Sequence, residues 1–198
     1  MFKHLLYICR ITKQSTLKHI IMATTKWAID PTHSEVQFKV KHLVISTVTG
    51  KFKSFSGTAE SVGDDFSNAS ISFAADVASI DTNQEQRDGH LKSEDFFNAE
   101  KYPQITFKGT SFTKVKGDEY KLTGNLTIKD VTKPVTLDVE YGGTATDFYG
   151  NVKAGFEVSG KISRKEFGLT WDGITEAGAI VVGEEVKITA NVQLAKQA

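Results

Sequence analysis

The sequence predicts an all-β fold, an eight-stranded antiparallel β-barrel with a short helical insertion around residues 83–101. Three observations lead to this prediction. Apolar and polar residues alternate over most of the chain, with the period of a half-buried strand. Turn signals such as Gly117-Asp118 and Gly142-Gly143 separate the alternating stretches. The stretches are long, and a sheet of long antiparallel strands removes its edges by closing on itself.

The alternation defines eight strands along the chain. In the first, Val36, Phe38 and Val40 fall on one face, and Gln37 and Lys39 fall on the other. The remaining seven are predicted at 49–61, 69–77, 104–109, 120–130, 134–141, 151–162 and 184–194. At ~3.3 Å per residue, ten residues extend about 33 Å. Eight such strands enclose a space that side chains fill or that holds one slender ligand. An immunoglobulin-like sandwich is the competing fold, but its strands are usually shorter.

The helical insertion interrupts this pattern with charged residues and aromatics. Asn83 or Thr82 is the expected N-cap of a helix, and Asp95 is the expected cap of a second helical turn that ends before Pro103. The aromatic residues of this second turn would attach the insertion to the sheet. A helix laid over one end of a barrel closes that end and leaves the other as an entrance.

Composition bounds the function. The chain has 198 residues, the size of one ordinary domain, with 39% hydrophobic and 24% charged residues. Residues 22–198 hold 20 basic and 24 acidic side chains, an acidic balance that argues against a nucleic-acid partner. No apolar run reaches the length of a transmembrane helix. The single cysteine, Cys9, excludes a disulfide framework and a thiolate metal site.

Residues 1–25 are expected to lie outside the fold, as a disordered leader or as a mis-assigned start, with residues 26–198 forming the barrel domain. The leader is basic, but Arg10 breaks its short apolar run, so it makes a poor signal peptide. A start at Met22 would give a cytoplasmic protein. Export to the periplasm is the alternative.

Several stretches together resemble the YceI-like family. They are "WAIDPTHSEVQFKVKHLVISTVTGKF", "RDGHLKSEDFFNAEKYPQITF", "GNLTIKDVTKPVTLDV", "RKEFGLTWD" and "GEEVKITANVQL", which occur in the family's order over about residues 26–196. The resemblance implies a lipocalin-like barrel with a long apolar pore that binds polyisoprenoid-type lipids, and a homodimer. Many members of the family are periplasmic.

Inward-facing residues of the predicted strands are the candidate pore lining. Small residues among them, such as Ala75, Gly124, Ala154 and Ala190, would leave space inside the barrel, whereas a fully packed core has few voids. The same alternation also describes a filled core, so the residues alone leave both interpretations open. The proposed lining residues are Phe38, Val40, Phe73, Ala75, Phe97, Phe107, Leu126, Ala154, Phe156 and Val158.

Polar residues of the insertion have two interpretations. Arg87, His90 and Asp95 are candidates for contacting a lipid head group, with Asp88 holding the arginine, or for tying the insertion to neighbouring strands. A catalytic role for His90 would need a nucleophile, and the body has neither a cysteine nor a Gly-x-Ser-x-Gly elbow. No metal-ligand set is spaced correctly, so neither a metal nor a cofactor is expected.

The expected function is therefore a non-enzymatic carrier for a long apolar lipid, either a polyisoprenoid or an isoprenoid quinone. Two alternatives remain from the sequence. One is an enzyme that acts on a hydrophobic substrate through the His90 region, and the other is a filled barrel that serves as an interaction module.

Overall fold

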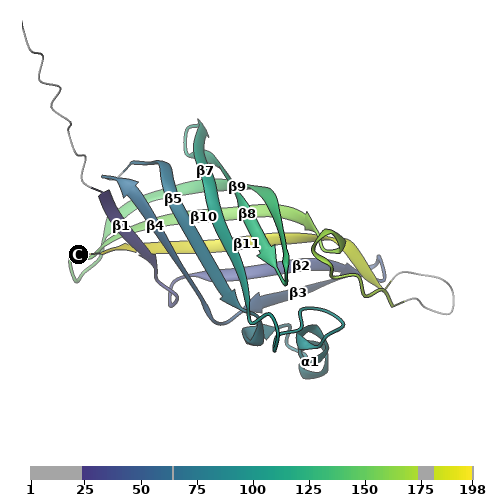
Figure 1. Ribbon diagram of the computed structural model, residues 1–198. Helices are drawn as coiled ribbons and strands as arrows, with labels where there is room; N and C mark the ends of the chain where they lie inside the picture. Colours follow the sequence, from purple (N-terminus) through teal and green to yellow (C-terminus); the bar gives the residue numbers. More distant parts are fainter. Residues whose placement is uncertain (1–23, 64, 174–180, 198) are drawn as a thin grey trace, which may run out of the picture.

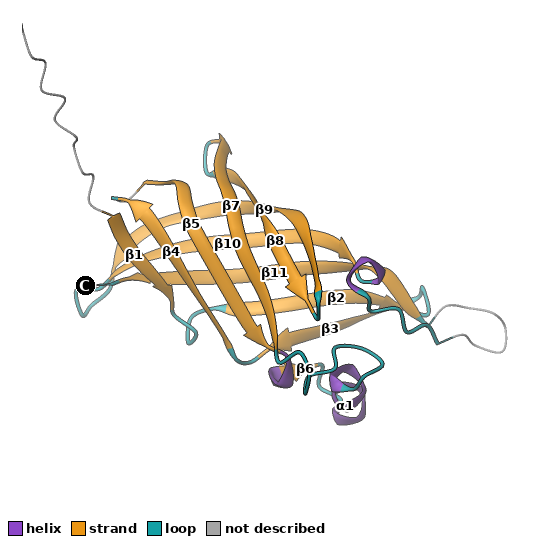
Figure 2. Ribbon diagram, viewed as in Figure 1, coloured by secondary structure: helices purple, strands orange, loops and turns teal. Residues whose placement is uncertain are grey.

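The computed structural model describes residues 24–63, 65–173 and 181–197. Strands dominate these residues, and one α-helix, α1 (Glu85–Lys92), accompanies them with two short 3₁₀ turns, η1 (Val77–Ser79) and η2 (Lys165–Phe167) (Figure 2). The strands are β1 (Thr24–Ile29), β2 (Glu35–His42), β3 (Ser46–Phe52), β4 (Phe55–Val62), β5 (Asp65–Asp76), β6 (Ile80–Asp81), β7 (Gln104–Lys116), β8 (Glu119–Ile128), β9 (Val131–Thr146), β10 (Val152–Ser163) and β11 (Val182–Lys196).

Eight antiparallel strands close a barrel, as the sequence predicts. The ring runs β1-β4-β5-β7-β8-β9-β10-β11 and closes where β1 pairs with β11 (Figure 1). Strand β11 is long enough to pair with β1 through Leu194 and with β2 through Ala190. Strands β2, β3 and β6 extend the sheet from β11 at the end of the barrel where α1 lies.

Side-chain alternation explains why these segments form a barrel. Along β8, every second residue from Tyr120 to Ile128 is buried, and the intervening residues are exposed or half-buried. A barrel strand requires this pattern because its two faces meet the interior and the solvent in turn. The predicted strands 120–130, 134–141 and 151–162 match β8, β9 and β10, and β9 is longer than expected.

Two strand predictions need correction. The predicted strand 49–61 is two strands, β3 and β4, separated by Lys53 and Ser54. Strand β1 lies before the first predicted strand, and its register with β4 and β11 buries Trp27 inside the barrel. Its six residues are too few to show a clear alternation, which is why the pattern of the sequence did not predict it.

The helical insertion is shorter than the predicted 83–101. Helix α1 covers Glu85–Lys92, and its N-cap is Gln84, whose side chain accepts a hydrogen bond from the backbone N–H of Arg87. The expected second helical turn after Asp95 does not form. Asn98 has φ +51°, and its carbonyl accepts from the N–H groups of Lys101 and Tyr102, so this segment folds as successive turns.

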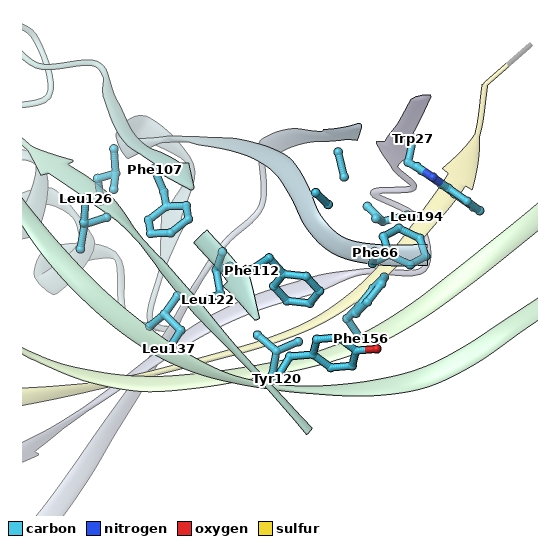
Figure 3. Packing of buried hydrophobic residues seen from close by; sticks show 14 of the residues in the cluster. Trp27, Phe66, Phe107, Phe112, Tyr120, Leu122, Leu126, Leu137, Phe156 and Leu194 are labelled. Carbon is cyan, nitrogen blue, oxygen red and sulfur yellow. The ribbon is translucent and has the colours of Figure 1, made fainter. Parts of the chain in front are cut away.

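An aromatic cluster fills the end of the barrel remote from α1. The rings of Phe66 and Phe156 meet edge-on at 5.0 Å between centroids, and Trp27 lies 5.0 Å from Phe66 (Figure 3). Phe112 stacks on Tyr120 at 4.8 Å. Edge-on and offset contacts of this kind add to the free energy of apolar burial. In the part of the chain that the structure describes, no helix has the length and apolar character needed to cross a bilayer.

Candidate functional site

An apolar cavity of about 270 Å³ runs inside the barrel. Side chains from nearly every strand form its wall, together with Leu91 of α1 and with Phe96 and Phe97 of the segment that follows. All but four of the described residues that line it are apolar, and those four are Gln37, Thr58, Ser72 and Arg164. Its volume lies just below the range for small-molecule sites, about 300–1,000 Å³.

The structure places nine of the ten proposed lining residues in the cavity wall. They are Phe38, Val40, Phe73, Ala75, Phe97, Phe107, Leu126, Phe156 and Val158. Ala154 is the exception. It is only 1% exposed, but it belongs to the packed core and not to the cavity wall. Ala154 pairs with Leu194 near the aromatic end of the barrel, where Trp27 and Phe66 occupy the interior.

Small residues differ in whether they leave space. Ala75 and Ala190 line the cavity. Gly124 does not, because the ring of Phe107 fills the place of its missing side chain. A Cβ atom at Gly124 would lie 2.3 Å from Cζ of Phe107. The expectation that Gly124 enlarges the pore is therefore wrong.

Sequence reasoning missed part of the wall. Val186, Ile188, Val192 and Leu194 line the cavity from β11, and their alternation in "EEVKITANVQL" is a signal that could have identified them. Arg164 gives no such signal, because nothing in its local sequence shows that it will be buried.

Among the described residues of the cavity wall, Arg164 is the one that carries a charge, and it is only 3% exposed. All five of its N–H groups are used. Nε donates to the carbonyl of Gly183 at 2.9 Å, Nη1 donates to the carbonyls of Leu169 and Trp171, and Nη2 donates to the carbonyl of Val182 and to the carboxylate of Asp172. An arginine has no further donor. Arg164 therefore holds the 169–172 segment against β11 and has no N–H group left for a ligand.

Asp172, which is partly exposed, is the acidic partner of Arg164. Its carboxylate accepts from Lys165 Nζ at 2.6 Å and from Arg164. The hydrogen bond from Lys165, followed by that from Arg164, lowers the pKa of Asp172 below its ordinary value. The carboxylate therefore stays ionised at neutral pH beside the buried guanidinium.

The first polar group of the insertion is organised around Thr82, which is 3% exposed. Arg87 donates to the Thr82 hydroxyl from Nε and to the Thr82 carbonyl from Nη2, each at 2.7 Å. Asp88 accepts from the backbone N–H and the hydroxyl of Thr82. Arg87 and Asp88 are thus joined through Thr82 and form no direct ion pair, so Asp88 does not hold the arginine as expected.

His90, on α1, packs against two aromatic side chains. Its ring meets Phe96 and Trp171 edge-on, with centroid separations of 5.0 and 4.9 Å, and its Nε2 lies 3.0 Å from Oδ2 of Asp95. Arg87, His90 and Asp95 are not part of the cavity wall. Among the described residues, no group of three His, Cys, Asp or Glu side chains is arranged to hold a metal ion.

Comparison with known proteins gives consistent matches. Residues 27–194 match the YceI-like domain family. The chain is 44% identical over 140 residues to Protein YceI of Salmonella newport, an alignment that covers 71% of this chain and 73% of that protein.

Solved structures share the fold. The crystal structure of BcnA from Burkholderia cenocepacia has a TM-score of 0.73 and 25% identity, covering 83% of this chain and 98% of that one. A polyisoprenoid binding domain from Saccharophagus degradans has a TM-score of 0.63 over 86% of this chain and 98% of that one. At 15% identity, this second similarity is one of fold alone.

Proposed function

Because this chain belongs to the YceI-like family, we propose that it carries a long apolar lipid, a polyisoprenoid or an isoprenoid quinone, in the barrel cavity without changing it chemically. The observation that carries the proposal is the apolar wall of the cavity, which extends from Phe66 and Phe112 at the aromatic end to Leu91 and Phe96 at the α1 end. The similarity in fold to a domain described as polyisoprenoid-binding supports the same ligand class.

The chemistry of the wall favours an extended hydrocarbon. Burial of apolar surface contributes about 25 cal/mol per Å², or ~0.8 kcal/mol per methylene group. A chain of isoprenoid units therefore gains affinity along its whole length without any polar contact. A compact polar ligand would lose its hydration in this cavity and would find few partners there.

The polar groups near the cavity support binding in preference to catalysis. Arg164 donates all of its N–H groups to the protein, and Arg87 is engaged with Thr82. His90 lies outside the cavity wall, against Phe96 and Trp171. A general base must come within hydrogen-bond reach of its substrate, and no titratable side chain of the described cavity wall is free to do so.

A pair of neighbouring substitutions on β11 tests the site. Ala190 faces the cavity and pairs with Val158 and Val36 across the neighbouring strands, whereas Asn191 is exposed on the outer face. Ala190→Phe should place a ring in the cavity and strongly reduce the lipid content of the purified protein. Asn191→Phe introduces the same side chain one residue away and should leave the lipid content unchanged.

The measurement is mass spectrometry of organic extracts from the wild type and both variants, purified from the native host, with circular dichroism to verify folding. A prenyl lipid in the wild type and in Asn191→Phe, but not in Ala190→Phe, supports the proposal. Empty wild-type protein that also rejects added isoprenoids would contradict it. A lipid that is recovered chemically altered after incubation would instead favour the enzyme alternative.

A further inference from the structure

The turn between β2 and β3 contains three consecutive apolar residues, of which the first is half-buried and the other two are exposed. Leu43, Val44 and Ile45, here called the apolar tip, connect the paired residues His42 and Ser46. Val44 is 76% exposed and Ile45 is 87% exposed. Single exposed apolar residues are common on protein surfaces, but adjacent ones at the end of a projecting hairpin are not explained by packing within the barrel.

The apolar tip also has an unfavourable backbone. Leu43 has φ +50° and Val44 has φ +66°, in the left-handed region where tight hairpin turns usually place Asn or Gly. A β-branched residue at positive φ is a genuine outlier, and such outliers cluster at functional sites. Asn or Gly would be better suited to the turn itself, so the apolar side chains are a cost to folding that the fold does not require.

Lysines lie on the outer surface behind the apolar tip. Lys161, Lys187 and Lys39 are directly opposite one another across β10, β11 and β2, and Lys41 is next to the tip on β2. All four are exposed. Like charges that face each other across strands are unfavourable. These four lysines, here called the lysine row, are thus a second feature that the stability of the fold does not explain.

Nearby acidic residues do not cancel this charge. Glu185 pairs with Lys161 at 3.0 Å, and Glu184 accepts a hydrogen bond from Ser163 on the neighbouring strand. Within the described ranges, no acidic side chain forms an ion pair with Lys39, Lys41 or Lys187. The surface behind the tip therefore carries a net positive charge.

The apolar tip lies at one end of the cavity. The N–H of Leu43 donates to the carbonyl of Val181 at 2.9 Å, and His42 pairs with Val182. Val182 and Val40 both line the cavity, and the carbonyl of Val182 accepts from Arg164. The tip is thus attached to the strand end that forms this part of the cavity wall, on the right in Figure 1.

We propose that the apolar tip and the lysine row dock the protein onto the surface of an anionic lipid bilayer. Apolar side chains that enter the headgroup boundary, together with lysines that face anionic lipids, are the two contributions that bind peripheral proteins to membranes. A stable protein partner usually covers about 800 Å² per side, far more than three residues offer. A bilayer needs no complementary shape, so a small projecting tip is enough.

The experiment measures cosedimentation of the full chain with vesicles made of phosphatidylglycerol and phosphatidylcholine in equal amounts. Wild-type protein should bind these vesicles, and the double variant Val44→Asn with Ile45→Ser should bind at least about tenfold more weakly. Asn tolerates positive φ, so the same variant should melt at an equal or higher temperature. Weaker binding together with undiminished stability cannot result from a damaged fold.

A matched control removes exposed aromatic residues elsewhere. Phe148 and Tyr149, 106% and 91% exposed, lie in the β9–β10 turn at the opposite end of β11, next to Asp147 and away from the lysine row. Phe148→Ser with Tyr149→Ser should leave vesicle binding unchanged.

The lysine row is tested separately. Lys39→Gln with Lys187→Gln should weaken binding to anionic vesicles, and added salt should weaken it as well by screening the charges.

Three outcomes would overturn the proposal. They are the absence of vesicle binding by the wild type, undiminished binding by the tip variant, and equal binding to vesicles of phosphatidylcholine alone. Capture of a soluble protein by the wild type without vesicle binding would assign the tip to a protein partner instead. Lipid extraction from the same variants tests the cavity separately, so failure of docking and failure of cargo binding are distinguishable.

Discussion

Arg164 shows how a buried charge can be fully satisfied without serving a ligand. Its guanidinium donates to four carbonyl oxygens and one carboxylate, in a planar arrangement that lysine cannot reproduce. The side chain therefore fixes the loop after β10 onto the start of β11, at the edge of the cavity. Arg164 thus helps to fix the position of the cavity wall at this end.

Arg164→Lys should destabilise the protein by about 2–3 kcal/mol, because three lysine donors leave buried carbonyls without a partner. Urea denaturation followed by circular dichroism measures this loss. Lys165→Met is the matched control. It removes a partly exposed cation from the same carboxylate of Asp172 and should cost less than about 1 kcal/mol. Equal losses from both variants would contradict the role assigned to the buried guanidinium.

Gly124 offers a second test at the residue scale. A Cβ atom there would meet the Phe107 ring at 2.3 Å and the Lys108 carbonyl oxygen at 2.6 Å. Gly124→Ala should therefore cost about 1–3 kcal/mol through overpacking. Gly155→Ala, at a strand position with no neighbouring atom within 4 Å, should cause little change in the same denaturation experiment. An unaffected Gly124→Ala variant would show that the Phe107 ring moves aside freely.

The link between β1 and β2 is the clearest feature at the scale of elements. The two strands follow one after the other along β11, and Asp30 lies at the break between them. Its carboxylate accepts from the Thr32 hydroxyl at 2.6 Å and from Lys153 of β10 at 3.0 Å. These hydrogen bonds of Asp30 therefore keep β1 and β2 aligned along β11, although the pairing with β11 is interrupted between the two strands.

Asp30 should make stability depend on pH. The hydrogen bond from Thr32, followed by that from Lys153, lowers the pKa of Asp30 well below its usual value. A depressed pKa in the folded state means that Asp30 contributes stability above its unfolded pKa of about 3.9, and that this contribution is lost as the pH falls toward the folded pKa. Asp30→Asn should thus cost about 2 kcal/mol near pH 7 and progressively less below about pH 4.

Urea denaturation of the wild type and Asp30→Asn, once near pH 7 and once below about pH 4, measures this difference in the free energy of unfolding directly. Asp138→Asn is the control. Its carboxylate pairs with Lys121 while both side chains remain about half exposed, so it should change stability little at either pH. A pH-independent difference between wild type and Asp30→Asn would exclude a contribution from the lowered pKa of Asp30.

At the scale of the whole molecule, the alternation of apolar residues predicted the strands, because the two faces of a strand alternate regardless of distant contacts. The length of the strands then favoured a closed barrel over a sandwich. It could not give the position of a residue along the barrel axis. Ala154 and Ala190 both face inward, yet Ala190 lines the cavity and Ala154 lies where distant aromatic residues fill the interior. The effect of Gly124 likewise depends on a ring that β7 supplies.

Polar residues were harder to assign from sequence for the same reason. Arg87 and Asp88 are neighbours in the chain, but Thr82 determines how they are connected. The partners of Arg164 are mostly backbone carbonyls, which every residue has and no sequence pattern marks. Side-chain types predict which groups can interact, and only the packing of remote strands decides which of them do.

Strand β11 has a consequence for how the protein is made. It is the last described strand, and it holds β10, β1 and β2 at once. A nascent chain that has not yet extended past residue 182 leaves β10 and the first two strands with unpaired edges and an open apolar interior. Contacts between the two ends of a chain also slow folding. The barrel can therefore close only after β11 has left the ribosome, and until then the unpaired strand edges and the open apolar interior favour aggregation.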